Sequence, residues 1–231
     1  MTAEGVEETP RCVCLVHGRA GWRSLRAPRA AALGSTLVAE DPLLFVPSDP
    51  SAAILGAPGG LALLEAGRAL GDVRLLGPYA AYSALDLARR RTVDRFRGER
   101  RAMPAKVARQ GVAQLLAADP ALEAAADWAE VLRLHGVMVS NAVQLKDGSL
   151  ALFEHIAAGN HSCDPNSEIV SAAALGAGWR GHPMGAALRA TRAIGAGEEV
   201  TYSYVPSLML RARARDRRDF ILVHRGFECR C

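Results

Sequence analysis

Residues 160–166 read Asn-His-Ser-Cys-Asp-Pro-Asn, a septet that could do chemistry. The septet combines two amides, an imidazole, a hydroxyl, a thiol and a carboxylate, and apolar pairs flank it at Leu152-Phe153 and Ile169-Val170. Burying so many polar groups is costly unless each finds a hydrogen-bond partner. A surface loop carries them at no such cost, so the septet alone fits a loop as well as a site.

Three other segments carry candidate functional groups. Residues 197–204, Gly-Glu-Glu-Val-Thr-Tyr-Ser-Tyr, form a predicted strand with two tyrosines. Residues 226–231, Gly-Phe-Glu-Cys-Arg-Cys, place two thiols two positions apart. Residues 18–22, Gly-Arg-Ala-Gly-Trp, follow a short apolar stretch, and their glycines suit either a plain hairpin turn or a close approach of the backbone to a ligand.

Composition narrows the function classes. The chain has 231 residues, of which 50% are hydrophobic and 23% charged, as in an ordinary globular protein. A net charge of +4 is too small to indicate nucleic-acid binding. No apolar run reaches the roughly 20 residues of a membrane span, so no membrane association is expected. The acidic segment Met1–Pro10 and an odd cysteine count of 5 lead us to expect an intracellular protein without a disulfide framework.

Periodicity predicts a β-rich single domain interrupted by helices. Apolar residues at helical spacing between Gly59 and Gly136 predict three or four helices, with Gly136 as the stop signal. A basic helix is predicted over 208–223. The predicted strands cover residues 12–16, 34–40, 42–47, 143–145, 150–153, 169–175, 185–190 and 199–204. The predicted segments are 11–57 (N-terminal strands), 58–136 (helical insertion), 137–205 (second β region) and 206–231 (basic helix and cysteine pair).

In this order, the segments resemble those of SET-domain protein methyltransferases. The septet and residues 197–204 are similar to the paired signature of that family, and residues 226–231 resemble the start of its cysteine-rich post-SET segment. The helical insertion and Ser140-Asn141-Ala142 bring the chain closest to the SET and MYND branch. The zinc-binding MYND finger of that branch is absent, and the post-SET pattern stops at Cys231.

The resemblance implies a fold and a reaction. The fold would be α+β, a SET-domain β-clip of short strands with a pseudoknot and a helical insertion. The reaction would be transfer of a methyl group from S-adenosylmethionine to a lysine of a histone or another protein. An unperturbed lysine has a pKa of about 10.4, so deprotonating it at pH 7 costs roughly 4 to 5 kcal/mol. Desolvation in an apolar channel and a nearby sulfonium cation would both lower that pKa.

The resemblance also implies site residues. The hydroxyl of Tyr204 would line the methyl-transfer channel and act in catalysis, whereas Tyr202 would pack in the core. The amide of Asn160 would bind the amino-acid end of S-adenosylmethionine, and the main chain at His161 would contact the adenine. Further cofactor contacts would come from Gly18, Arg19, Ala20, Gly21, Trp22, Asn141, Tyr204 and Phe227.

Cys163, Cys229 and Cys231 match the zinc ligands of the post-SET segment. A structural zinc site has four ligands, so this set is incomplete as it stands. Cys12 and Cys14 either complete a site with the last two cysteines or are free thiols in a strand.

Two other functions stay open at this stage. An inactive SET module would bind a partner peptide without needing the Tyr204 hydroxyl. A zinc-binding structural domain would use the cysteines and bind no cofactor. For the methyltransferase we expect a monomer whose partner is a protein substrate with an accessible lysine.

Overall fold

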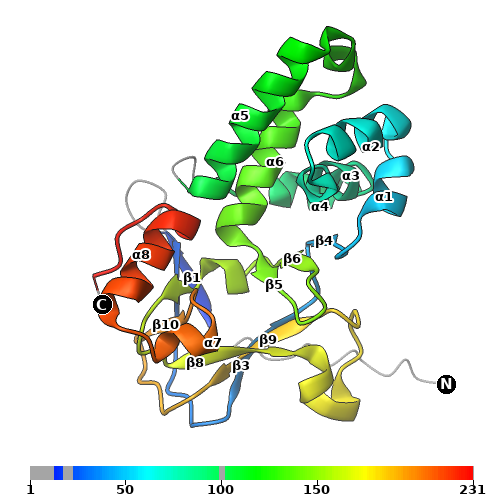
Figure 1. Cartoon of the computed structure of the whole chain (residues 1–231). Helices are drawn as coiled ribbons and strands as arrows, with labels where there is room; N and C mark the ends of the chain where they lie inside the picture. The colour runs from blue at the N-terminus through cyan, green and yellow to red at the C-terminus, as the bar shows by residue number, and fades with distance from the viewer. Residues whose placement is uncertain (1–12, 18–22, 99–101, 231) are drawn as a thin grey trace, which may run out of the picture. The chain divides into compact units, whose positions relative to one another are not determined.

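The computed structural model describes residues 13–17, 23–98 and 102–230 (Figure 1). Their contacts divide them into two compact units. The first unit contains the described residues up to Asp41 together with Ala158–Tyr204, and the second contains Pro42–Ala157 and Val205–Arg230. Each unit is therefore built from segments that are far apart in the sequence.

The first unit contains two small sheets. One has the strand order β1-β2-β10-β7 and the other β3-β9-β8. Their strands are β1 (Cys14–His17), β2 (Arg23–Arg26), β3 (Thr36–Glu40), β7 (Asn160–His161), β8 (Ser167–Ser171), β9 (Ala186–Ala190) and β10 (Glu199–Tyr202). A turn of 3₁₀-helix, η5 (Ala172–Gly178), follows β8.

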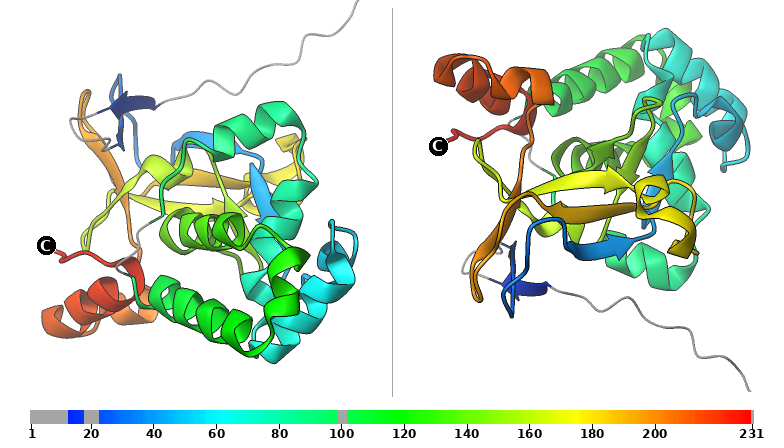
Figure 2. Two further views of the ribbon diagram at one scale, coloured as in Figure 1. Left: turned by 90° about the horizontal axis from the view of Figure 1, so that it is seen from above. Right: turned by 90° about the horizontal axis from the view of Figure 1, so that it is seen from below.

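Antiparallel pairing dominates these sheets. β2 pairs with both β1 and β10, and Figure 2 shows β8 and β9, drawn in yellow, running side by side. The sole parallel ladder recorded among the named strands joins β7 to β10. Leu25, Leu37 and Leu188 point inward and are fully buried. Short runs of buried apolar residues, such as Ala186-Ala187-Leu188 in β9, are typical of strands that are covered on both faces.

The second unit is mainly helical. The long helices α5 and α6 run side by side in Figure 1. Its helices are α1 (Ser51–Leu55), α2 (Gly60–Ala69), η2 (Val73–Leu75), α3 (Gly77–Ser83), α4 (Leu87–Val93), α5 (Met103–Ala118), η3 (Pro120–Ala125), α6 (Trp128–Asn141), α7 (Ser207–Leu210) and α8 (Ala214–Arg225). A further turn of 3₁₀-helix, η4 (Ile156–Ala158), ends where the chain re-enters the first unit.

Local sequence explains where these helices begin. Pro78 and Pro104 lie in the first turns of α3 and α5, where a missing N–H costs nothing. The carboxylates of Asp86 and Asp127 accept hydrogen bonds from Arg89 N and Glu130 N and so cap α4 and α6. No helix of the described residues is both long and apolar enough to cross a membrane.

A three-stranded sheet of order β4-β6-β5 completes the second unit. Its strands are β4 (Leu44–Val46), β5 (Val143–Gln144) and β6 (Leu150–Leu152). The predicted hairpin of β5 and β6 is confirmed, and Gly148 adopts φ 85° in its turn. Buried apolar side chains of β4, β6 and α6, among them Leu44, Leu134 and Leu152, form a hydrophobic cluster.

Gly136 does not stop a helix, contrary to the sequence prediction. It lies inside α6, which continues to Asn141. A glycine in a helix interior costs only about 1 kcal/mol relative to alanine, so it need not end the helix. The neighbouring segment depends on a different glycine: a Cβ on Gly98 would lie 2.4 Å from the carbonyl carbon of Gly136, so Gly98 lets the segment after α4 lie directly against the backbone of α6.

Three other predicted elements have different boundaries. The strand predicted over 169–175 ends at Ser171, because an alanine run favours the helical turn η5 there. The basic helix predicted over 208–223 is two helices, α7 and α8, and Arg217 donates to the carbonyl of Ala212 in the connection between them. The last strand ends at Tyr202, so Tyr204 lies beyond it.

The glycine contact yields an asymmetric prediction. Gly98→Ala forces two backbone segments apart, so we expect it to lower the free energy of unfolding by about 1 to 3 kcal/mol. Gly136→Ala places its Cβ 3.8 Å from the Cα of Gly98, an ordinary contact, and removes a glycine from a helix interior. We expect this matched variant to be neutral or to gain up to about 1 kcal/mol. Urea denaturation of both variants measures the difference, and equal losses would refute the role given to Gly98.

Candidate active site

The start of the septet is a strand rather than a loop. Asn160 and His161 form β7, which pairs in parallel with Thr201 and Tyr202 of β10. The backbone N–H of Ser162 extends the ladder by donating to the carbonyl of Tyr202 at 3.1 Å. The two segments of the sequence signature are therefore hydrogen-bonded neighbours within the first unit.

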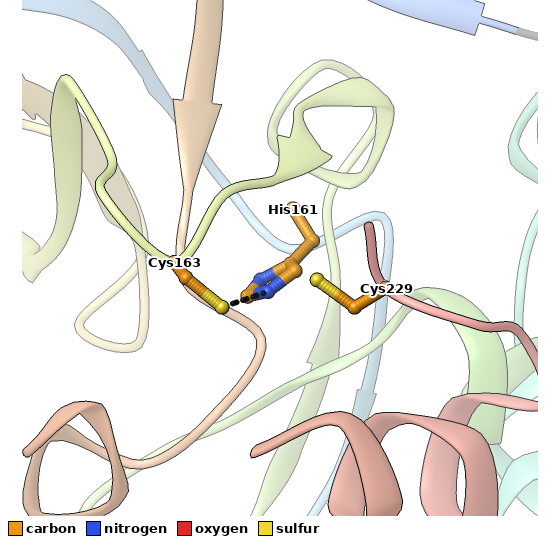
Figure 3. Close-up of side chains that lie close together, drawn as sticks. All are labelled: His161, Cys163 and Cys229. Carbon is orange, nitrogen blue, oxygen red and sulfur yellow. Dashed lines mark hydrogen bonds between the residues drawn. The ribbon is translucent and has the colours of Figure 1, made fainter. Parts of the chain in front are cut away.

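The His161 ring connects the septet to Tyr204. Its Nδ1 accepts a hydrogen bond from the backbone N–H of Tyr204 at 3.0 Å, and its Nε2 lies 3.3 Å from the Sγ of Cys163 (Figure 3). Since Nδ1 is an acceptor, the proton of the neutral imidazole is on Nε2 and is donated to the sulfur. His161 thus fixes the backbone at Tyr204, a role that the sequence prediction, centred on its main chain, did not include.

Tyr204 is anchored at both ends. Its backbone N–H is bound by His161, and its hydroxyl donates to the carbonyl of Gly159 at 2.7 Å. The ring of Tyr202, which is 8% exposed, lies 5.1 Å from the Tyr204 ring, as expected for a core aromatic. Because the phenol proton is donated to a carbonyl, the Tyr204 oxygen acts as an acceptor towards any other hydrogen-bond partner.

Asn160 is oriented by an acidic residue that the sequence prediction missed. Its Nδ2 donates to Oε1 of Glu199 at 2.6 Å. An amide whose nitrogen faces a carboxylate presents its oxygen as an acceptor, which suits an ammonium group such as that of an amino acid. The pairing of a strand glutamate with the septet could have been expected only if the parallel ladder had been known.

Asn166, the last residue of the septet, is the most important residue that sequence reasoning missed. Its side chain is 2% exposed. Nδ2 donates to Glu198 Oε1 at 3.0 Å and to the carbonyl of Glu199 at 2.7 Å, while Oδ1 accepts from the N–H of Thr201 at 2.9 Å. The amide therefore replaces a stretch of sheet ladder, which explains why a polar side chain is buried here.

The other predicted site residues belong to the second unit or lie outside the described residues. Residues 18–22 and Cys231 are outside the described residues. Asn141, Phe227 and Cys229 belong to the second unit. Asn141 ends α6 and donates through Nδ2 to the carbonyls of Arg97 and Val137, and Phe227 is 36% exposed. Their cofactor contacts stay predictions.

Zinc binding at Cys163, Cys229 and Cys231 also stays a prediction. The Nε2 of His161 and the Sγ of Cys163 lie 3.3 Å apart (Figure 3). Because a metal ion displaces the proton of the atom that it binds, this imidazole as well as the thiol could serve as a ligand.

The buried amide gives a stability prediction. Asn166→Ala leaves the N–H of Thr201 and the carbonyl of Glu199 without their partner, so we expect the free energy of unfolding to fall by about 2 to 4 kcal/mol. Ser162→Ala is the control, because it removes a single hydrogen bond, to the N–H of Asp164, in the same septet. Its expected cost is below about 1.5 kcal/mol. Guanidinium denaturation compares the two, and similar losses would contradict the assignment.

A second prediction concerns pH. Hydrogen bonds from Arg192, from the N–H of Gly195 and from Asn166 lower the pKa of Glu198 from 4.5 to about 2. A carboxyl with a lowered folded-state pKa stabilises the fold fully above pH 4.5, and this contribution is lost as the pH falls from 4.5 towards 2. Glu198→Gln should therefore melt at a lower temperature than the parent at pH 7, with the gap closing below pH 4.5. A gap that is constant with pH would exclude this origin.

The model of a family described as the SET domain matches residues 78–205. Solved structures that match include the SET domain of LSMT bound to lysine and AdoHcy (TM-score 0.51, 12% identity, 96% of this chain covered). The same domain bound to methyllysine and AdoHcy gives a TM-score of 0.52 at 12% identity, with 97% of this chain covered. The chain spans 54% of the length of each. No curated protein matches.

Proposed function

Because this chain belongs to the SET-domain family, we propose that it transfers a methyl group from S-adenosylmethionine to a lysine side chain of a protein. The LSMT structures of similar fold, which contain AdoHcy together with lysine or methyllysine, support the proposal. The observation that carries it is Tyr204, a tyrosine fixed by hydrogen bonds at its backbone and its hydroxyl beside the Asn160-His161 pair.

The proposed reaction needs a neutral lysine amine aligned with an electrophilic carbon. S-adenosylmethionine, when bound, supplies that carbon as the methyl group of a sulfonium. The chain must then position the amine and exclude water, since alignment of two reactants lowers the barrier by several kcal/mol. A rigid side chain in the wall of the methyl-transfer channel would serve this purpose. Tyr204 would be such a side chain, because Gly159 binds its hydroxyl and His161 binds its backbone N–H.

The Tyr204 oxygen would act as an acceptor. Its own proton is donated to Gly159, so the oxygen can accept a hydrogen bond from an N–H of the lysine amine, and this bond orients the single lone pair of the nitrogen. No ionised phenol is needed for this role. Asn160 would bind the ammonium group of the methyl donor through Oδ1 while Glu199 holds its nitrogen.

The finer assignments extend the same proposal. We place the chain in the SET and MYND branch, without a MYND finger, as a single SET domain that acts as an intracellular monomer. Its substrate would be a histone or another protein with an accessible lysine. A zinc ion on Cys163, Cys229 and Cys231 would be structural, and no step of the reaction depends on it.

Tyr204→Phe tests the proposal. The change keeps the ring but removes the acceptor, so we expect methyl transfer to fall by about a hundredfold or more. Binding of S-adenosylmethionine should change much less, because Asn160 and His161 are retained. Tyr79→Phe, a tyrosine of α3 in the second unit, is the matched control and should keep full activity. Radiolabelled methyl transfer to a panel of peptides and lysate proteins measures both variants.

The possible outcomes separate the proposal from its alternatives. A chain that binds neither S-adenosylmethionine nor peptide, but binds zinc tightly, would be a structural zinc domain. A chain that binds peptide but transfers no methyl group would be an inactive SET module. Transfer that is unaffected by Tyr204→Phe would remove Tyr204 from the reaction.

A further inference from the structure

The connection between α7 and α8 carries most of the net positive charge of the chain. Residues 211–219 read Arg-Ala-Arg-Ala-Arg-Asp-Arg-Arg-Asp, five arginines and two aspartates, so their formal charge is +3, whereas the net charge of the whole chain is +4. Both helices belong to the second unit and are drawn in orange and red in Figure 1. Tyr204 and Asn160-His161, on which the methyl-transfer proposal rests, belong to the first unit. Arg217 and Arg218 interact within the chain, which leaves three arginines to consider.

These three arginines are exposed and close together. Arg211, Arg213 and Arg215 all face solvent, and the side chain of Arg215 is 87% exposed. Each is two positions from the next, so their successive Cα atoms are at most about 7.6 Å apart, within the reach of one short peptide. Arg215 pairs with Asp219 at 3.7 Å, and such a surface pair is weak in water. Among the described residues, no partner is recorded for the side chain of Arg211 or Arg213.

Two of the arginines lie where a cation destabilises the following helix. Arg213 is the N-cap residue of α8 and makes no capping hydrogen bond through its side chain, and Arg215 lies in the first turn. N-cap positions favour Ser, Thr, Asp or Asn, and the partial positive charge at the start of a helix repels cations. Asp216 of the same turn offsets only part of this repulsion. Residues that oppose the local structure in this way are typical of binding surfaces, and an acidic partner would remove the repulsion.

An exposed leucine lies beside the arginines. Leu208 of α7 is 88% exposed, the largest value for a large apolar side chain among the described residues. Leu208 and Arg211, the C-cap residue of α7, are three positions apart, so their side chains lie on the same face of the helix. Covering this leucine removes apolar surface from water, which favours a partner with an apolar side chain of its own.

These features favour a protein partner over a nucleic acid or a membrane. Surfaces that bind single-stranded nucleic acid combine basic residues with aromatic ones for base stacking, and residues 205–219 contain no aromatic residue. An anchor for a membrane surface needs a continuous apolar face, whereas Met209 and Leu210 beside Leu208 are partly buried. Arginine clusters bind acidic peptide motifs, because each guanidinium can donate two parallel hydrogen bonds to a carboxylate.

We propose that Leu208, Arg211, Arg213 and Arg215 form a docking surface for an acidic segment of a partner protein. The carboxylates of that segment bind the three guanidinium groups, and an apolar side chain of the same segment covers Leu208. The partner is therefore a protein segment rich in glutamate and aspartate with a leucine or a similar residue among them.

Fluorescence anisotropy of the whole chain with a labelled peptide tests the proposal. The probe is fluorescein-labelled Gly-Glu-Asp-Leu-Glu-Asp-Gly at low ionic strength, where charge pairs are least screened. The same peptide with glutamine and asparagine in place of the acids should bind about tenfold more weakly or worse. Serine in place of the peptide's leucine, and Leu208→Ser in the protein, should each weaken binding by about threefold or more.

A triple variant tests the arginines. Arg211→Gln, Arg213→Gln and Arg215→Gln together should weaken binding of the probe by about tenfold or more. The matched control removes the same charge from three other exposed arginines of the second unit and should change the affinity by less than about twofold; its changes are Arg68→Gln, Arg89→Gln and Arg95→Gln.

Arg213→Asp separates binding from folding. An aspartate at this N-cap position can accept a hydrogen bond from the first turn of α8, so the melting temperature should rise by about 2 °C or more. Binding of the acidic probe should nevertheless weaken by about tenfold or more, because a cation is replaced by an anion. A loss of affinity that came from damage to the fold would lower the melting temperature instead.

Several outcomes would overturn the proposal. They are no binding of the acidic probe at millimolar concentration, equal affinity for its amide counterpart, and equal effects of the two triple variants. Tighter binding to a DNA duplex or to phosphatidylserine vesicles than to the acidic probe would assign the surface to another class of partner. None of these measurements depends on methyl transfer, so the two proposals can fail separately.

Discussion

The parallel pairing of β7 with β10 is the interaction on which the candidate site depends. It brings Asn160-His161 beside Thr201-Tyr202 although the two segments are far apart in the sequence. A ladder of two residue pairs is weak by itself, and side chains reinforce it. Asn166 binds the backbone on both sides of Val200, and His161 binds the backbone at Tyr204. Removing any of these contacts would loosen the wall that the methyl-transfer proposal requires to be rigid.

The septet is polar because each of its anchoring groups replaces a missing backbone partner. Asn166 completes a ladder that β10 cannot form with a neighbouring strand at that point, and His161 accepts an N–H just beyond the end of β10. Buried polar groups that are fully hydrogen-bonded define one geometry, whereas apolar groups of the same size would allow several. The septet therefore has a structural role, and the methyl-transfer proposal relies on the same contacts.

Much of this arrangement could be predicted from the sequence, for identifiable reasons. The hairpin of β5 and β6 was predictable because Asp147-Gly148 is a typical turn sequence. The predicted strands at 34–40 and 185–190 hold β3 and β9, which contain short apolar runs bounded by turn residues. The hydrogen-bond partners of Asn166 and His161 could not be predicted, because they depend on a parallel ladder between distant segments. Gly136 was misjudged because a glycine inside a helix costs only about 1 kcal/mol relative to alanine and does not by itself end the helix. The end of β10 before Tyr204 was also missed, because the alternating pattern continues through Ser203.

The sheet of the second unit has a consequence for how the chain folds. Arg26 and Gly197, which are joined by a hydrogen bond in the first unit, are 171 residues apart in the sequence. Closing so long a loop is entropically costly and slows folding. The pairing of β4 with β6 joins the two ends of the intervening segment, Leu44 with Leu152. Once β4 and β6 have paired, the loop that still has to close between Arg26 and Gly197 is much shorter. Folding of the helical segment therefore lowers the entropic cost of pairing the strands on either side of it in the sequence.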